Sequence, residues 1–209
     1  YDKPLIHYPL QILLDAGIKD IMIISGTEHI DQIAEYLGSG SKFGCTFSFK
    51  IQEKAGGIAQ ALGLAADEFA DGESVCAILG DNVYFDDLSS HIQSFTGGGH
   101  VFLKEVDDPE RFGIAEIENN KVISVEEKPA QPKSNLAITG CYVYDNRCFE
   151  VIKNLKPSAR GEFEITDVTD WYLQNGELNA TTLDKDWIDA GTFERLFLAA
   201  SKVRDQKNS

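Results

Sequence analysis

Apolar residues recur along the chain in short blocks that end at glycine, asparagine or charged residues. The block Val75–Leu79 contains β-branched residues and stops at Gly80, Asp81 and Asn82, which predicts a buried strand with a polar tip. In open α/β sheets, ligands bind beyond the carboxyl ends of strands, where a carboxylate can hold a cation against a phosphate. Asp81 is therefore the first candidate functional residue, although a simple turn or a helix cap explains the same residues equally well.

The first half of the chain alternates between strand and helix patterns. Short apolar or alternating runs predict strands over residues 19–25, 46–52 and 75–79, and helical spacing predicts helices over 9–16, 28–37 and 57–69. The glycine-rich segment Gly38–Gly44 follows a helix instead of a strand, so we interpret it as a helix stop and a loop and not as a dinucleotide fingerprint. Such alternation indicates a mostly parallel, doubly wound sheet.

Strands dominate after residue 86. They are predicted over residues 100–105, 114–117, 122–126, 137–144, 178–183 and 187–188, with helices over 88–95, 148–155, 165–173 and 192–203. Asn119 and Asn120 mark a hairpin, and Thr192 is a plausible N-cap of the closing helix. We expect one α/β domain over residues 1–209, without internal repeats.

Composition excludes several classes of partner. The chain has 209 residues, a formal net charge of −15 and no apolar run near the roughly 18 residues of a membrane span. A strongly negative protein is repelled by nucleic acids and by anionic membranes, so we expect neither as a partner. No secretory leader pattern opens the chain, and we expect a soluble, cytoplasmic protein.

The cysteines and histidines do not form a metal motif. No CxxC, HxxxH or HExxH spacing occurs, and most of the cysteines lie inside apolar segments. We therefore expect reduced core cysteines more readily than metal ligands or disulfides. The four cysteines are Cys45, Cys76, Cys141 and Cys148.

Asp189 repeats the pattern of Asp81. It lies in the segment WIDAGT, where a short apolar run again ends in Asp and then Gly. Two carboxylates about 4 Å apart repel by a few kcal/mol at an effective dielectric constant near 20, so a pair of this kind needs a cation. Oxygen ligands suit Mg²⁺, which completes its shell from phosphate and water. The pairing of Asp81 with Asp189 is a hypothesis at this point.

The segment VEEKP, residues 125–129, combines acidic and basic groups at a strand end. Adjacent strand residues point to opposite faces, so Glu126 and Glu127 cannot both face one pocket. Glu127 is suited to accept hydrogen bonds from hydroxyls, and Lys128 to meet a phosphate, whereas an exposed charged strand end is the plainer interpretation. The guanidinium group of Arg160, in the segment PSARGE, can bind a phosphate through two parallel hydrogen bonds.

Eight segments spread over the chain resemble one family. The chain is similar to the sugar-1-phosphate nucleotidyltransferases, most closely to the short glucose-1-phosphate thymidylyltransferases. The resemblance implies a Rossmann-like, doubly wound mixed α/β sheet of the nucleotide-diphospho-sugar transferase type. The segments, in the order of the family, are YDKPLIHYPL, IQEKAGGIAQALG, ILGDN, DDPERFGIAEI, VEEKPAQPKSN, AITGCYVYD, LKPSARGEFEITD and DAGT.

The resemblance also implies roles for individual residues. Asp81 and Asp189 would hold Mg²⁺, and Asn82 would lie beside the sugar. Gln52, with backbone groups at Gly57, would recognise the imide edge of thymine or uracil. Lys128 and Arg160 would bind the sugar phosphate. The hexose site would be lined by Phe112, Gly113, Glu127, Ile138, Thr139 and Gly140.

The implied reaction is attack of a sugar-1-phosphate oxygen on the α-phosphorus of dTTP, which gives dTDP-glucose and pyrophosphate. Such a reaction depends on in-line positioning and charge neutralisation. A homo-oligomer that supplies sugar nucleotides for polysaccharide synthesis is the family expectation. Two alternatives stay open: a non-catalytic member that binds a sugar nucleotide or a partner, and a uridylyltransferase that uses UTP.

One departure from the family pattern concerns the start of the chain. The family begins with a strand and a glycine-rich GGxGTRL loop, followed by a Lys shortly before the segment that matches YDKP, and this sequence contains none of them. The loop would cradle the triphosphate opposite Asp81. We therefore expect an N-terminally incomplete nucleotidyltransferase domain that lacks a central strand.

Overall fold

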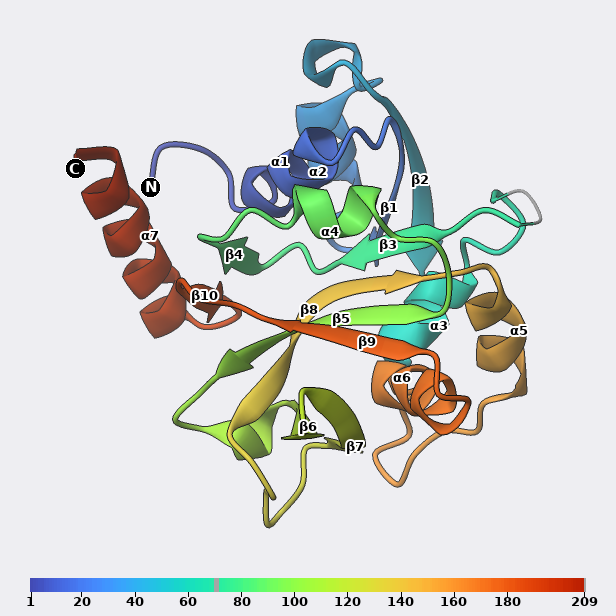
Figure 1. Cartoon of the computed structure of the whole chain (residues 1–209). Helices are drawn as coiled ribbons and strands as arrows, with labels where there is room; N and C mark the ends of the chain where they lie inside the picture. Colours follow the sequence, from blue (N-terminus) through green and yellow to red (C-terminus); the bar gives the residue numbers. More distant parts are fainter. Residues whose placement is uncertain (70–71, 209) are drawn as a thin grey trace.

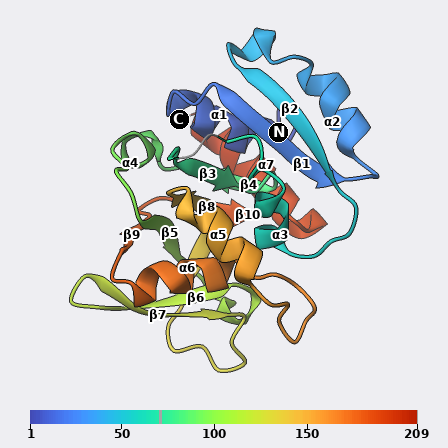
Figure 2. The same cartoon turned by 90° about the vertical axis from the view of Figure 1, so that its right-hand side faces the viewer.

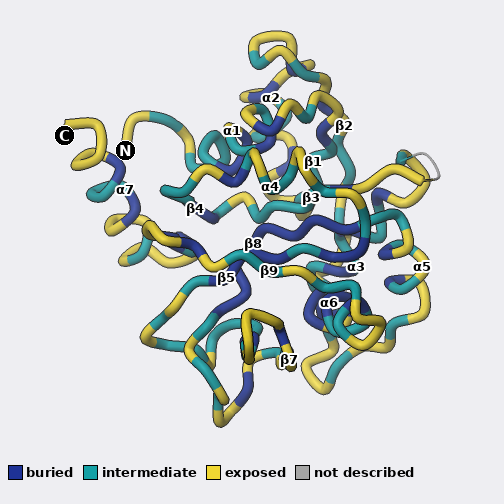
Figure 3. Tube along the Cα trace, in the orientation of Figure 1, coloured by how far each residue is buried: buried dark blue, intermediate teal, exposed yellow. Residues whose placement is uncertain are grey.

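A mixed six-stranded sheet forms the centre of the molecule (Figure 1). The computed structural model describes residues 1–69 and 72–208. The longest strand of this sheet, β8 (Leu136–Tyr144), is buried from Ala137 to Tyr144, and Figure 3 shows it as the buried middle of the fold. Its apolar residues on both faces are typical of a strand that is covered on both sides.

Four further strands complete the sheet around β8 and β3. One edge of β8 pairs with β5, and the other edge pairs with β6 near its start and with β3 near its end, all antiparallel. β6 continues into an antiparallel hairpin with β7, and β5 pairs in parallel with β9. Their bounds are β3 Val75–Ile78, β5 Gly99–Glu105, β6 Gly113–Glu118, β7 Lys121–Glu127 and β9 Leu178–Thr182.

A separate two-stranded parallel sheet lies in the N-terminal part of the chain, as Figure 2 shows. β1 (Asp20–Gly26) pairs with β2 (Thr46–Gln52) along its whole length. Helices α1 (His7–Asp15) and α2 (Ile30–Leu37) pack on it through a cluster that includes Leu10, Leu13, Ile21, Leu37 and Phe47.

A third, two-stranded sheet joins distant parts of the sequence. β4 (Asn82–Tyr84) pairs antiparallel with β10 (Trp187–Asp189), which places Asp189 opposite Asn82. Helix α7 (Phe193–Asn208) covers this pair through Ala199 and Val203. The backbone N–H of Arg195 donates to Thr192 Oγ1 at 3.3 Å, which confirms Thr192 as the cap of this helix.

The remaining helices cover the central sheet and the loops around it. The main core lies between the sheet and α3, α5 and α6, and includes Leu62, Val101, Tyr144 and Val168. The bounds are α3 Ile58–Gly63, α4 Ser89–Gln93, α5 Arg147–Asn154 and α6 Ile165–Gln174, with 3₁₀ turns η1 Ser41–Phe43 and η2 Pro109–Arg111.

The predicted strands and helices are present, but the expectation of a mostly parallel sheet was wrong. Within the described residues, only the β1–β2 and β5–β9 pairs are parallel. The reason is that β6 and β7 form a hairpin, and the chain then reverses so that β8 runs antiparallel to both β5 and β6. The mixed α/β class that the resemblance implies is confirmed. The strand β4 was missed, since Asn82 was assigned to a turn, and α3 ends at Gly63, earlier than predicted.

The local turn predictions are confirmed. Asn119 and Asn120 have φ values of 50° and 62°, as a two-residue hairpin requires. Gly38 ends α2, and only a 3₁₀ turn lies within the loop that follows. The four cysteines are free thiols, with Cys141 and Cys148 buried. Among the described residues, no helix is both long and apolar enough to cross a membrane.

Candidate active site

The two predicted metal-binding carboxylates lie together. A backbone hydrogen bond of 2.8 Å from the Ala190 N–H to the Asp81 carbonyl ties the segment after β10 to the segment after β3. A Cβ atom built on Gly191 would lie 3.2 Å from Asp189 Oδ1 and 3.3 Å from Asp81 Oδ2. Both carboxylates therefore converge on the same small space, which the absence of a side chain at Gly191 keeps open.

The two carboxylates carry like charges and are partly buried. Burial, and next the negative charge of Asp81, raise the pKa of the Asp189 carboxyl above its usual value. Arg111 Nη2 lies 3.6 Å from Asp189 Oδ2 and offsets part of this repulsion. The pair is thus poised to bind a cation.

The donor set fits magnesium. Mg²⁺ is commonly held by one or two carboxylates and completes its octahedral shell with phosphate oxygens and water. The described residues contain no cluster of three or more His, Cys, Asp and Glu side chains of metal-site geometry, so a closed cage of protein ligands is absent from that part of the chain. Asp81 and Asp189 thus offer two carboxylates, a donor set that is compatible with an open Mg²⁺ site.

Asn82 connects this pair to the central sheet. Its side chain is 2% exposed, and its Nδ2 donates to Asp81 Oδ1 at 2.8 Å. Its Oδ1 accepts hydrogen bonds from Trp187 Nε1 at 2.7 Å and from the Gly140 N–H at 3.1 Å. Asn82 thus lies between the carboxylates and Gly140, where it orients Asp81.

Gly140 is required by this contact. A Cβ atom at Gly140 would lie 2.7 Å from Asn82 Oδ1 and 2.8 Å from the Leu79 side chain, so a larger residue would push Asn82 away. The neighbouring Thr139 is fully buried, and its hydroxyl is the one buried side-chain polar atom without a hydrogen-bond partner in the described structure. Thr139 lies near the Tyr84 hydroxyl, which instead donates to Asn82 Oδ1 at 3.4 Å.

The predicted hexose residues on β6, β7 and β8 adjoin one another. Gly113 is in register with Glu127, and a Cβ atom at Gly113 would lie 3.3 Å from Glu127 Oε2 and 3.8 Å from Ile138. Thr166, at the start of α6, donates to Glu127 Oε2 at 2.5 Å. Glu127 is half-buried while Glu126 is exposed, which confirms that the two face opposite sides.

Phe112 joins this region to the carboxylate pair. Its ring meets the Trp187 indole edge-on, with ring centroids 5.3 Å apart. Its carbonyl accepts a hydrogen bond of 3.0 Å from the Lys128 N–H. The loop PERFG therefore contacts both the β10 strand and the VEEKP strand end, and it links the carboxylate pair to the candidate hexose residues.

Lys128 has an unusual backbone. Its φ of 41° lies in the left-handed region, which a residue with a long side chain adopts at a cost of order 1–3 kcal/mol. Lys128 Nζ lies 4.0 Å from Glu127 Oε1. Strain of this kind is often found at binding sites, and here it occurs directly after the end of β7.

Arg160, the second predicted phosphate ligand, is surrounded by carboxylates. Its Nη2 lies 2.9 Å from Glu164 Oε2, 3.0 Å from Glu162 Oε2 and 3.4 Å from Glu127 Oε1. Burial favours the neutral form of Glu164, but hydrogen bonds from Arg160 and Ser158 outweigh it and hold the Glu164 pKa below its usual value. The structure thus places Arg160 near Glu127 and Lys128, with its charge already offset.

Gln52 and Gly57 are also brought together, at the carboxyl end of β2. Gln52 Nε2 donates to the Gly57 carbonyl at 3.1 Å and to Gln60 Oε1 at 2.8 Å. Gly57 has a φ of 100°, and a Cβ atom there would lie 2.4 Å from the Phe163 carbonyl oxygen, so only glycine fits. Gln60, which also accepts from the Gly56 N–H, was not predicted.

The sequence did not indicate a group of charged side chains, Asp108, Arg111 and Arg195, that lies near Asp189. Asp108 Oδ2 accepts from Arg111 Nη1 at 2.8 Å and from Arg195 Nη2 at 2.5 Å. Arg111 in turn approaches Asp189. The signal for Arg111 is its place in PERFG, directly before Phe112, whereas nothing near Arg195 indicates a partner 87 positions away.

Comparison with known proteins agrees with this site and fold. A family model for nucleotidyl transferases matches residues 1–206, and the chain belongs to this nucleotidyl transferase family. Within it, the chain is 44% identical over 215 aligned positions to the glucose-1-phosphate thymidylyltransferase of Neisseria meningitidis, covering 100% of this chain and 74% of that protein. It is 40% identical to the enzyme of the same name from Mycolicibacterium smegmatis, covering 98% of this chain and 73% of that protein.

Solved structures give the same result. The fold superposes with a TM-score of 0.90 and 48% identity on a Bacillus anthracis protein assigned as a glucose-1-phosphate thymidylyltransferase, solved in complex with a sucrose, over 97% of this chain and 83% of that one. A UDP-glucose pyrophosphorylase complexed with UDP-glucose superposes with a TM-score of 0.81 at 22% identity, over 98% of this chain and 88% of that one. This second likeness shows the shared fold.

Proposed function

We propose that the protein transfers the thymidylyl group of dTTP to glucose-1-phosphate, giving dTDP-glucose and pyrophosphate. The observation that carries the proposal is the convergence of Asp81 and Asp189 on the space beside Gly191. It occurs in a chain whose relatives at 40–44% identity are named for this activity. The carboxylate pair, Glu127 beside the open backbone of Gly113, and the cations Lys128 and Arg160 together suit a metal, a sugar and a phosphate.

Asp81 and Asp189 would hold Mg²⁺, with Asn82 as the residue that orients Asp81. When bound, the metal supplies positive charge to the phosphate oxygens. The Asp108–Arg111 pair keeps Asp189 in place from the other side. The role of this chain's own residues is therefore to fix two carboxylates at a distance that neither tolerates without a cation.

The sugar phosphate would bind along β8 and the ends of β6 and β7. Glu127 offers an acceptor for sugar hydroxyls, while Gly113 and Gly140 let the ring approach the backbone. Lys128 and Arg160 would bind the phosphate of glucose-1-phosphate. For Arg160 this requires that the phosphate displaces the half-exposed carboxylate of Glu162, which otherwise pairs with the guanidinium.

Gln52 would recognise the base. A primary amide carries both a donor and an acceptor, which matches the imide edge of thymine. The hydrogen bond to Gln60 holds the Gln52 amide plane in one orientation, so Gln60 is a positioning residue for base recognition. The same edge occurs in uracil, and the choice of thymine is based on the named relatives.

No covalent intermediate on the protein is needed in this scheme. The phosphate oxygen of glucose-1-phosphate attacks the α-phosphorus of dTTP, and the bond from the α-phosphorus to the bridging oxygen of pyrophosphate breaks. The protein contributes alignment of the two substrates and stabilisation of the charge on the phosphoryl oxygens. The free cysteines take no part.

The test is release of pyrophosphate from dTTP by the natural gene product, with and without glucose-1-phosphate, in the presence of Mg²⁺. We expect pyrophosphate and dTDP-glucose in equal amounts and only when both substrates are present, and dTTP to outcompete UTP. Absence of product from a folded protein that still binds dTDP-glucose by calorimetry would contradict the proposal. A homo-oligomeric state, expected for the family, is tested separately by sedimentation.

A further inference from the structure

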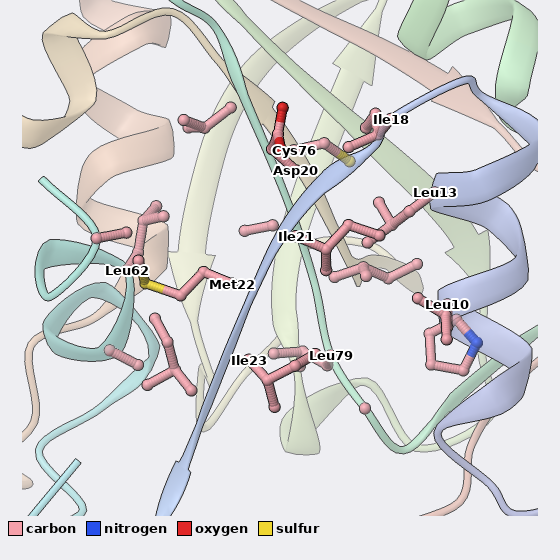
Figure 4. Close-up of a pocket in the computed structure, with 18 of the residues that line it drawn as sticks. Leu10, Leu13, Ile18, Asp20, Ile21, Met22, Ile23, Leu62, Cys76 and Leu79 are labelled. Atoms are coloured by element: carbon pink, nitrogen blue, oxygen red, sulfur yellow. The ribbon is translucent and has the colours of Figure 1, made fainter. Parts of the chain in front are cut away.

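The residues that lead into Asp81 carry no charge. They line an apolar pocket between β1 and β3, and Figure 4 shows Leu79 and Ile23 together at one end of it. Gly80 also lines this pocket, directly before Asp81. A cation approaches the carboxylate pair from a different element, the 3₁₀ turn η2, which carries Arg111.

Arg111 is shared unequally between two carboxylates. Its Nη1 donates to Asp108 Oδ2 at 2.8 Å, whereas its Nη2 lies 3.6 Å from Asp189 Oδ2, which is longer than a hydrogen bond. The guanidinium Cζ also lies 5.3 Å from the centre of the Phe112 ring. Arg111 is therefore hydrogen-bonded to Asp108, and it approaches Asp189 without bonding to it.

Asp108 is itself held by a second arginine. Arg195 Nη2 donates to the same Oδ2 oxygen at 2.5 Å. Arg195 lies in the first turn of α7, and this helix begins directly after the segment that carries Asp189. Asp108 thus connects Arg111 to the helix that follows Asp189, and these two bonds fix the spacing between Arg111 and Asp189.

The two oxygens of Asp189 face different partners. Oδ1 accepts from the Gly191 N–H at 3.2 Å and borders the space beside Gly191 that Asp81 also borders. Oδ2 faces Arg111. A guanidinium that bound Asp189 closely through two parallel hydrogen bonds would use both oxygens and place its positive charge beside the cation site. A closer Arg111 would therefore compete with a divalent cation.

We propose that Asp108 is a positioning residue that holds Arg111 back from Asp189, so that the Asp189 carboxylate stays available to a divalent cation. The inference rests on the proposed function, which assigns this cation to Asp81 and Asp189. Asp108 acts through Arg111 and not as a metal ligand. The side chains of Asp108, Arg111 and Asp189 are 22–38% exposed, so water screens their charges and the effects are severalfold.

Two substitutions should change cation binding in opposite directions. Asp108→Asn removes the charge that holds Arg111, so Arg111 pairs more closely with Asp189, and we expect cation affinity to fall about threefold or more. Arg111→Gln removes the competing charge, and we expect affinity to rise by about the same factor. A purely structural role of the Asp108–Arg111 pair would weaken binding in both variants.

The experiment measures binding of Mn²⁺ alone to the natural gene product, from the electron paramagnetic resonance signal of the free ion. Mn²⁺ suits the same carboxylate and water ligands as Mg²⁺. Asp107→Asn is the matched control, because Asp107 is exposed, adjacent to Asp108 and of the same charge. We expect this control to stay within about twofold of the wild type. The double variant Asp108→Asn/Arg111→Gln should bind Mn²⁺ as tightly as Arg111→Gln, because Asp108 then has no arginine to hold.

Asp81→Asn separates this inference from the proposed metal site. If Asp81→Asn leaves Mn²⁺ binding unchanged, the cation binds elsewhere, and the metal site and the role of Asp108 both fail. If Asp81→Asn weakens binding but Asp108→Asn behaves as Asp107→Asn does, the metal site stands and the role of Asp108 is overturned. The same conclusion follows if the loss caused by Asp108→Asn persists in the double variant, because the effect then does not pass through Arg111.

Discussion

The indole Nε1 of Trp187 donates a hydrogen bond of 2.7 Å to the side-chain oxygen of Asn82, 105 positions earlier in the chain. Asn82 in turn donates to Asp81, and it lies opposite Asp189 in the β4–β10 register. Asn82 thus contacts Asp81 through its side chain and is paired with Asp189 through the backbone. A neutral hydrogen-bond network therefore helps to position the carboxylates of the proposed metal site.

The first prediction concerns Trp187. Trp187→Phe keeps the aromatic contact with Phe112 but removes the indole donor, so that the buried Asn82 oxygen loses its shortest hydrogen bond. We expect a loss of about 1–2 kcal/mol in the free energy of unfolding, measured by urea denaturation, and weaker Mg²⁺ binding. Trp171→Phe, away from the carboxylates, is the matched control. Equal Mg²⁺ affinity in the two variants would show that the Asn82 network does not position Asp81.

The second prediction concerns the carboxylates around Arg160. The Glu162 side chain is 40% exposed, so Glu162→Gln should change stability by no more than about 0.5 kcal/mol. It releases part of the guanidinium for the phosphate, and we expect the KM for glucose-1-phosphate to fall severalfold. Arg160→Lys keeps the positive charge but loses the two-point hydrogen bonding of the guanidinium group, and it should raise this KM by about tenfold or more. Glu150→Gln, on the surface of α5, is the control.

The proposal requires that the KM for glucose-1-phosphate falls in Glu162→Gln and rises in Arg160→Lys. If Arg160→Lys leaves the KM for glucose-1-phosphate unchanged, Arg160 serves only to hold Glu164 and the start of α6, and the phosphate is bound elsewhere.

The third prediction concerns His100 and pH. Burial, and next the charge of His91, lower the pKa of His100 from 6.5 to about 4, and its Nε2 is paired with Thr181 Oγ1 at 3.0 Å. Since the unfolded chain takes up this proton near pH 6.5 and the folded chain does not, the contribution to stability is present above pH 6.5 and is lost as the pH falls toward 4.

The measurement compares urea unfolding at pH 7 and pH 5. We expect the wild type to lose about 1–2 kcal/mol more than His100→Gln, a value reduced for partial exposure of the ring. His29→Gln, on the surface before α2, should behave as the wild type. An identical pH dependence in wild type and His100→Gln would mean that His100 is protonated in the folded protein at pH 5.

The fourth prediction concerns base recognition. Gln60→Leu removes the acceptor that holds the Gln52 amide while leaving Gln52 itself in place. We expect a severalfold higher KM for dTTP without a change in the KM for glucose-1-phosphate, and a larger effect from Gln52→Leu. If both variants keep the wild-type KM for dTTP, the base binds away from the end of β2.

The sequence predicted those parts of the fold that local patterns determine. Thr46–Gln52 alternates in polarity and forms the strand over the same residues, and the two Asn residues form the hairpin turn. Asp81 and Asp189 were found because each follows a short apolar run and precedes a glycine or a polar turn. These patterns depend on neighbouring residues in the sequence, so they can be recognised without knowledge of the tertiary contacts.

The remainder depends on distant pairings. The local sequence of β8 does not specify that β5, β6 and β3 are its neighbours, because those pairings involve residues far away in the chain. Similarly, β4 is a strand because it pairs with the distant β10. The partners of Arg160 were missed for a similar reason, since Glu127 reaches it from 33 positions away. In each case the local sequence permits several partners, and the packed core selects one.

The most direct test of the proposed site is the Mg²⁺ dependence of pyrophosphate release in Asp81→Asn, with Glu150→Gln as a surface control. The substitution keeps the size of the side chain and removes the charge that would bind the metal. We predict that turnover falls by at least a hundredfold and that the Mg²⁺ concentration for half-maximal rate rises. A near-normal rate with an unchanged Mg²⁺ dependence would remove Asp81 from the metal site and contradict the account.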